Sequence, residues 1–322
     1  MTRPVDLTPG SAELAGPSAT GAPRVSRIRP ARRGRPLWLM LPAITLLVLV
    51  VGIPFVLAVW MSLTRLDQYS VRHWLTAPWA GLDNYRDALL SAGLPHSLWL
   101  SLAFAVLTTV IATPLGLLAA LSVNSRFPGR GVVRSLYLVP YVIPTFVAGT
   151  AWRILLQPSG QLNNLLQALG LPGGAHWLIG PVSFWTLVGV DVWASWPFIY
   201  LMTLAGLQTI STETYEAADL DGTTWWQKTV HIVLPQIRGQ LSLGLLLSTL
   251  QHFNNFTLPY LLFGSPAPDP VNVLPINIYQ TSFQVFRFGL GAAMSIGALI
   301  LTAIPALAYL RAVRLNAQPQ EV

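Results

Sequence analysis

The sequence has no cysteine and very few charged residues. Of its 322 residues, 10% are Asp, Glu, Lys or Arg, whereas 53% are hydrophobic. The absence of cysteine excludes disulfide bonds, thiolate metal ligands and cysteine nucleophiles. A soluble domain carries about 25% charged residues, so this composition indicates an integral membrane protein.

The sequence also lacks the motifs of an intramembrane enzyme or a nucleotide hydrolase. No Gly-x-x-x-x-Gly-Lys run is present, so we expect any ATP to be hydrolysed by another chain. The five histidines are scattered and form no HExxH or ExxH pattern, and His252 has no evident partner. We therefore expect no catalytic residue, no metal site and no cofactor in this chain.

The net charge of +7 is concentrated near the N-terminus. Seven of the 19 basic residues precede the first apolar run, which is the positive-inside pattern of a cytoplasmic tail and argues against a nucleic-acid partner. Residues 1–35 are otherwise rich in Pro, Gly, Ala and Ser, so we expect them to be disordered. The first apolar run starts too late and is too long for a cleavable signal peptide.

Six apolar segments follow, each near the roughly 20 residues that cross a bilayer. They predict an all-α integral membrane protein with a six-helix domain over residues 36–313 and a short C-terminal tail over 314–322. Four prolines in the middle segments remove helix hydrogen bonds, either as packing kinks or beside a water-lined path. The segments are residues 37–63, 97–124, 135–156, 182–208, 241–263 and 289–311, and the prolines are Pro114, Pro144, Pro197 and Pro259.

The orientation of these segments follows from the basic residues between them. With the N-terminus inside, fourteen Lys and Arg residues lie on the cytoplasmic side and five on the outer side. Both termini are therefore expected in the cytoplasm, together with the connection between the fourth and fifth segments.

That connection, residues 211–239, is a polar and acidic island. Ser211 or Thr212 can cap a helix that has acidic residues in its first turns. We expect a second short helix from Trp226 to His231, ended by Pro235. An amphipathic connector resting on lipid is the alternative, but an anionic inner leaflet would repel its carboxylates.

The island carries a recognisable spacing of residues. Glu216-Ala217-Ala218, three residues, Gly222, nine residues and then Ile232-Val233-Leu234-Pro235 resemble the cytoplasmic signature of permease subunits of binding-protein-dependent ABC importers. The resemblance implies a type I importer permease in the bacterial cell membrane, with a coupling loop over residues 209–240. The coupling residues it implies are Glu216, Ala217, Ala218, Asp221 and Gly222; Thr223, Thr229 and Gly239 depart from the usual pattern.

The same resemblance implies a set of partners. These are a second related permease, a dimer of ATP-binding subunits that hold ATP and Mg²⁺, and an extracellular substrate-binding lipoprotein. The coupling loop would dock in a cleft of the ATP-binding subunit and transmit its closure to the membrane helices.

Three further segments resemble the carbohydrate-importing class, and especially the larger membrane subunit of maltose importers. They are residues 140–146, 191–198 and 253–256. The resemblance implies import of a sugar by alternating access, with trehalose or a maltose-like di- or oligosaccharide as examples. The residues that would touch the sugar are Tyr141, Thr145, Asp191, Ala194, Ser195, Phe198, Phe253 and Asn254.

Each of these side chains also has a simpler explanation. Aromatic rings accept the C–H faces of sugars and polar groups pair with their hydroxyls, but Tyr141 and Phe198 can equally be packing residues and Asn254 an interhelical hydrogen-bond donor. Asp191 is either an acceptor for sugar hydroxyls, a partner for an Arg of the companion subunit, or a protonated carboxyl. No basic residue of the chain is expected at its depth, which argues against an anionic substrate.

A secondary transporter or a channel-like protein for small polar solutes is the alternative function. It should show inverted repeats or several intramembrane ionisable groups. Asp191 alone is too little for that interpretation.

Overall fold

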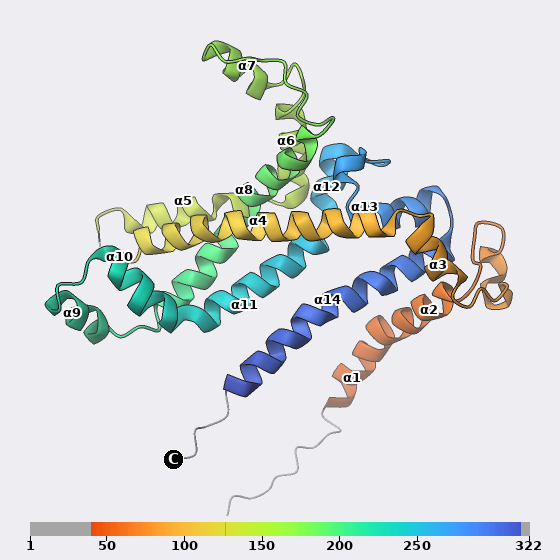
Figure 1. Ribbon diagram of the computed structural model, residues 1–322, viewed down its shortest axis with the longest axis horizontal. Helices are drawn as coiled ribbons and strands as arrows, with labels where there is room; N and C mark the ends of the chain where they lie inside the picture. The colour runs from red at the N-terminus through yellow and green to blue at the C-terminus, as the bar shows by residue number, and fades with distance from the viewer. Residues whose placement is uncertain (1–39, 126, 317–322) are drawn as a thin grey trace, which may run out of the picture. The chain divides into compact units, whose positions relative to one another are not determined.

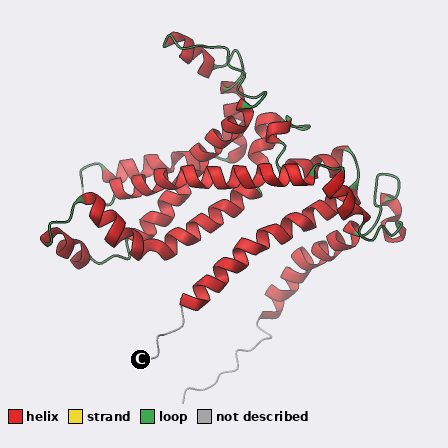
Figure 2. Ribbon diagram, in the orientation of Figure 1, coloured by secondary structure: helices red, strands yellow, loops and turns green. Residues whose placement is uncertain are grey.

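The computed structural model describes residues 40–125 and 127–316. The expected N-terminal tail over residues 1–35 lies outside this part of the chain, as do residues 317–322. Across the described residues the chain forms helices joined by loops and turns, without a strand (Figure 2). This confirms the predicted all-α class.

Five helical segments are long and apolar enough to cross a membrane, and a bent pair of helices supplies a sixth. The first segment joins α1 (Leu41–Leu47), the π-helical turn η2 (Val48–Gly52) and α2 (Ile53–Ser62). Three others are the single helices α4 (Leu94–Ser122), α8 (Val182–Leu207) and α14 (Phe288–Asn316). The fifth joins α10 (Trp225–Gln227), the π-helical turn η4 (Lys228–Val233) and α11 (Leu234–Phe253).

The third predicted segment is broken rather than continuous. Its two halves, α5 (Arg130–Val142) and α6 (Thr145–Leu155), meet at an angle of 83°. Ile143 at the junction is extended, with φ −66° and ψ 125°. A residue before a proline is pushed out of the α conformation, so Pro144 explains the position of the break.

The fifth segment lies further toward the N-terminus than predicted. Its helix begins at Trp225 and ends at Phe253, so Pro235 does not end a separate short helix. Pro235 instead stands in the first turn of α11, directly after η4, where the wider π-helical turn accommodates the missing N–H. Residues 254–256 then interrupt the helix before α12 (Thr257–Phe263).

The four prolines divide into two kinds. Pro114 and Pro197 lie inside the continuous helices α4 and α8. Pro144 precedes α6, and Pro259 is the third residue of α12, where a helix leaves its N–H groups without intrahelical partners in any case. Only Pro144 and Pro259 therefore mark interruptions of the helical backbone.

Helices α4, α8 and α11 pack against one another as the centre of the bundle (Figure 1). Helix α5 packs on α8, α6 on α12, and α14 on α2. One buried cluster gathers around Phe104, Leu187 and Leu258, and a second around Tyr200 and Ile237. These clusters hold α8 between its neighbours along most of its length.

The remaining helices are short and belong to the connecting segments. They are η3 (Val71–Thr76), α3 (Asp83–Leu90), α7 (Gln161–Ala168), α9 (Thr212–Leu220), η5 (Asp269–Val271), α13 (Leu274–Tyr279) and η6 (Gln280–Gln284).

Asn163 organises the connection that contains α7. Its amide group donates to the carbonyl oxygens of Gln157, Pro158 and Ala175 at 3.3, 3.0 and 3.1 Å, and its oxygen accepts from Trp177 Nε1 at 3.0 Å. The side chain is fully buried, so these hydrogen bonds hold the connection together beside the apolar contacts of Leu162 and Trp177.

Candidate functional site

A cavity of about 340 Å³ lies where the broken α5–α6 pair meets α8 and the end of α11. Six of the eight predicted sugar-contacting residues line it. They are Tyr141, Thr145, Asp191, Ala194, Ser195 and Asn254. The structure thus brings together three segments that are far apart in the sequence.

Both interruptions of the helical backbone border this cavity. Ile143 lines it from the α5–α6 break, and residues 254–256 line it from the α11–α12 break. Irregular backbone at membrane depth is tolerated where it lines a polar cavity. The two breaks therefore favour a solute site here over a purely structural void.

Asp191 stands on α8 with its side chain only 6% exposed. Its Oδ1 accepts a hydrogen bond from Asn255 Nδ2 at 3.1 Å, and its Oδ2 lies 2.6 Å from Nδ1 of His252. The second contact is short but poorly directed, and Oδ2 has no well-directed donor among the described residues. Each carboxylate oxygen nevertheless contacts a side chain of this chain, Asn255 at Oδ1 and His252 at Oδ2.

His252 has a partner after all, contrary to the expectation from the sequence. It lies one residue before the end of α11, and its ring is 4% exposed. Its Nε2 lies 3.0 Å from Ser248 Oγ, and the ring of Phe104 packs against it edge to face. A basic group therefore does lie at the depth of Asp191.

The order Asp191–His252–Ser248 has the connectivity of a hydrolase triad, but the placement does not suit catalysis. Ser248 is 1% exposed and does not line the cavity. A nucleophile must reach its substrate, and Ser248 is sealed among the helices. We interpret the three residues as a buried polar chain that joins α8 to α11.

Two predicted residues do not line this cavity. Phe198 packs beside Tyr141, which does line the cavity, with ring centroids 6.3 Å apart. Phe253 is buried and lines a separate, mostly apolar cavity of about 410 Å³ together with Phe256 and Tyr279.

The structure also adds residues that the sequence reasoning missed. Gln251, His252, Asn255 and Thr257 line the cavity, and Gln251 and Thr257 are exposed in this chain. Asn255 belongs to the segment that carried the resemblance. Gln251 stands in the last turn of α11, three residues before its C-cap Asn254, and this spacing is the signal that could have identified it.

The acidic island forms the expected first helix. The side chain of Ser211 caps α9 by accepting from the N–H of Thr214. Glu216 and Ala217 are exposed, whereas Ala218 is buried and its carbonyl accepts from the Thr223 hydroxyl at 2.7 Å. Of the three residues in the Glu-Ala-Ala run, two therefore face outward.

The turn after α9 is built for a sharp reversal. Gly222 has a φ of +67°, a conformation that glycine adopts without strain. Thr224 and Gln227 then form a reciprocal capping box at the start of α10, and Lys228 pairs with Asp219 across the turn. These contacts join Asp221 and Gly222, two of the predicted coupling residues, to the helix that leads to the cavity.

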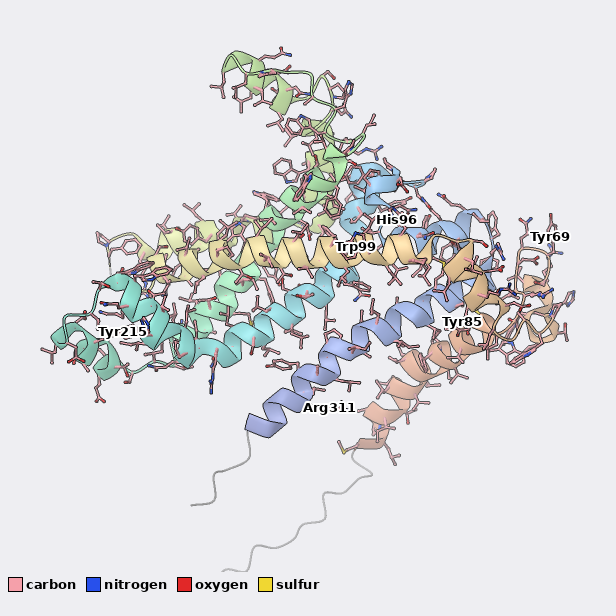
Figure 3. All side chains as sticks on the ribbon, in the orientation of Figure 1. Tyr69, Tyr85, His96, Trp99, Tyr215 and Arg311 are labelled. Carbon is pink, nitrogen blue, oxygen red and sulfur yellow. The ribbon has the colours of Figure 1, made fainter. Side chains whose placement is uncertain are left out.

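The island lies beside the connection between α4 and α5. Tyr215 projects from α9 (Figure 3), and its hydroxyl accepts from Asn124 Nδ2 at 3.3 Å. Two connections that the arginine count assigns to one side of the membrane are thus neighbours in the structure.

Residues 112–317 match the family described as "Binding-protein-dependent transport system inner membrane component". This chain belongs to that family. It is a multi-pass inner-membrane permease subunit of an ABC transporter rather than an enzyme, and separate ATPase subunits hydrolyse ATP.

Two relatives resemble the chain over most of its length. The trehalose/maltose transport system permease protein MalF of Thermococcus litoralis is 32% identical over 85% of this chain and 91% of its own. The trehalose transport system permease protein SugA of Mycobacterium tuberculosis is 32% identical over 88% of this chain and 89% of its own.

A solved structure shares the fold. It is the crystal structure of a bacterial ABC transporter involved in the import of the acidic polysaccharide alginate, with a TM-score of 0.76, 22% identity, and coverage of 88% of this chain and 96% of that one. The likeness confirms the expected type I importer permease architecture.

Proposed function

We propose that this chain is the permease subunit of an ATP-driven importer that moves a sugar of di- or oligosaccharide size into the cell by alternating access. The observation that carries the proposal is the cavity where six residues of the carbohydrate-class segments converge. Its volume of about 340 Å³ falls within the range of small-molecule sites. The named functions of the trehalose and maltose relatives support the same substrate class.

The site has the two surfaces that a sugar requires. Tyr141 offers an aromatic ring for C–H faces, while Thr145, Gln251 and Asn254 are exposed and offer polar groups for hydroxyls. Substrate would enter from an extracellular binding protein. A second permease would complete the path, and both termini would face the cytoplasm with the ATP-binding dimer.

The substrate class is tested with the whole complex in proteoliposomes. ATPase activity is measured with binding protein and a panel of trehalose, maltose, sucrose, an amino acid mixture and inorganic phosphate. Stimulation by at least one sugar, and by neither control, is expected. Stimulation by the amino acids or phosphate alone would overturn the sugar assignment.

The energy source is tested in the same vesicles. An ATPase-inactive partner subunit should abolish uptake, whereas collapse of the proton gradient at constant ATP should leave it intact. The reverse result would favour a secondary transporter.

The role of the coupling loop is tested by Glu216→Lys. Glu216 is exposed on α9, so reversing its charge costs little inside the chain, whereas loss of a desolvated charge contact with a partner costs about 2–5 kcal/mol. We expect the complex to assemble and to hydrolyse ATP. The amount of sugar imported per ATP hydrolysed should fall at least about tenfold relative to wild type. Glu213→Lys, one turn earlier, is the matched control and should keep most coupling. Normal coupled uptake by Glu216→Lys would refute the assignment.

A further inference from the structure

The cavity contains one carboxylate and one imidazole, and they face each other. Among the described residues that line it, Asp191 is the acidic side chain and His252 the basic one. Their side chains are 6% and 4% exposed, and the contacting atoms are 2.6 Å apart. A buried charge in a membrane requires a partner. The imidazole of His252 is that partner for the carboxylate of Asp191, and the carboxylate is the partner for the imidazole.

Burial leaves Asp191 little surface for a ligand, although its Oδ2 has no well-directed donor among the described residues. Asn255 donates to Oδ1 and His252 lies against Oδ2. Asn255 is fixed in turn, because its own Oδ1 accepts the backbone N–H of Leu258 at 3.2 Å. Asp191 therefore orders the interruption between α11 and α12, while the exposed Gln251 and Asn254 remain available to substrate.

We propose that His252 is a specificity-determining residue that keeps the cavity electrically neutral by pairing with Asp191, so that the site selects uncharged glycans. The inference rests on the proposed sugar function and names the substrate class of that site. Asp191 acts as a positioning residue through His252 and Asn255. The polar groups of the wall contact the sugar in its place.

The proposal makes the two residues interdependent. Asp191→Asn leaves the imidazole without its counter-charge, and His252→Gln leaves the carboxylate without its own. Each single variant should reduce kcat/KM for an uncharged sugar by about tenfold or more. The double variant, which places two neutral amides against each other, should recover most of that loss. A direct sugar contact by Asp191 would leave the double variant as impaired as Asp191→Asn.

Selectivity gives a readout that a purely structural role would not change. The probes are trehalose, maltose and sucrose, each compared with an analogue in which one hydroxyl is replaced by an ammonium group. In His252→Gln the unbalanced carboxylate should shift the ratio of ATPase stimulation toward the amino sugar by about tenfold relative to wild type. Asp191→Asn should shift it away, and the double variant should return it to the wild-type ratio.

The charge pair is also tested without any substrate. Infrared difference spectra of the reconstituted complex, with Asp191→Asn as the subtracted reference, report whether Asp191 carries a proton. We expect the carboxylate bands of Asp191 to differ between wild type and His252→Gln, because the imidazole contacts Oδ2 in wild type. Thr249→Val, a neighbour on α11 outside the pair, should leave the spectrum unchanged.

The outcomes separate this inference from the proposed function. If no sugar stimulates the wild-type complex, the sugar function fails, and the infrared spectra still decide whether the pair exists. If sugars stimulate it but the carboxylate bands are identical with and without His252, or selectivity stays unchanged in both single variants, then His252 does not set specificity.

Discussion

The contact between α4 and α8 depends on Gly116, and replacing it makes a quantitative test of the bundle. A Cβ at this position would lie 2.7 Å from the backbone nitrogen of Tyr200 and 2.8 Å from Cβ of Ile199. Real Cβ atoms do not approach that closely, and a backbone atom cannot rotate away. Small residues at helix crossings in membranes permit such close approach.

The cost of Gly116→Ala can be worked from this geometry. The helices must separate at a point where Ile199 and Tyr200 are 0% and 1% exposed, and overpacking of a tight core costs about 1–3 kcal/mol. Gly189→Ala on α8 is the matched control, because its Cβ meets nothing within 4 Å. That change gains up to about 1 kcal/mol of helix propensity. Gly116→Ala gains the same propensity, so the two variants should differ by the overpacking cost alone, about 1–3 kcal/mol.

The assay is thermal denaturation of the purified complex in one detergent, with sugar-stimulated ATPase as a second readout. Gly116→Ala should lower the Tm by several degrees, and Gly189→Ala should leave it unchanged or raise it. Equal Tm values for the two variants would refute the close packing of α4 on α8. A Gly116→Leu variant that assembles normally would refute it more strongly.

Two further predictions concern the connecting loop and the cavity. Asn163→Ala removes the donors to three carbonyls and should cost about 1–3 kcal/mol locally; limited proteolysis should cut residues 157–181 faster, and an uncut variant would contradict the role. Gln251→Ala should raise the apparent KM for the transported sugar at least about fivefold with little change in Tm, whereas an unchanged KM would remove Gln251 from the site.

The sequence predicts the helical segments because bilayer thickness sets a minimum apolar length that a window of residues reveals. It predicts the α5–α6 break less well. Pro144 shows where hydrogen bonding fails, but a proline such as Pro197 leaves α8 continuous. The outcome depends on which neighbours satisfy the freed carbonyls, and that is a property of tertiary packing.

The candidate site could likewise be predicted from the sequence only in part. Segment resemblance identified Asp191 and Asn254, and the structure places both at one cavity. The pairing of Asp191 with His252 could not be read from the sequence, because 61 positions separate them and neither lies in a motif with the other. Phe253 lines the neighbouring apolar cavity, and Asn254, which follows it at the end of α11, borders both cavities.

The helices that carry Asp191 and His252 both lead to the predicted coupling loop, so the chain connects the cavity directly to that loop. Helix α8 ends at Leu207, shortly before the Ser211 cap of α9. The other helix runs without a break from Trp225 in the loop to Phe253 at the cavity, 29 residues or about 43 Å. We therefore expect a displacement of the loop to reach the cavity through these two helices, which are in contact at Asp191 and His252. The interruption at residues 254–256 comes directly after His252. We therefore expect α12 to keep its packing on α6 when α11 moves.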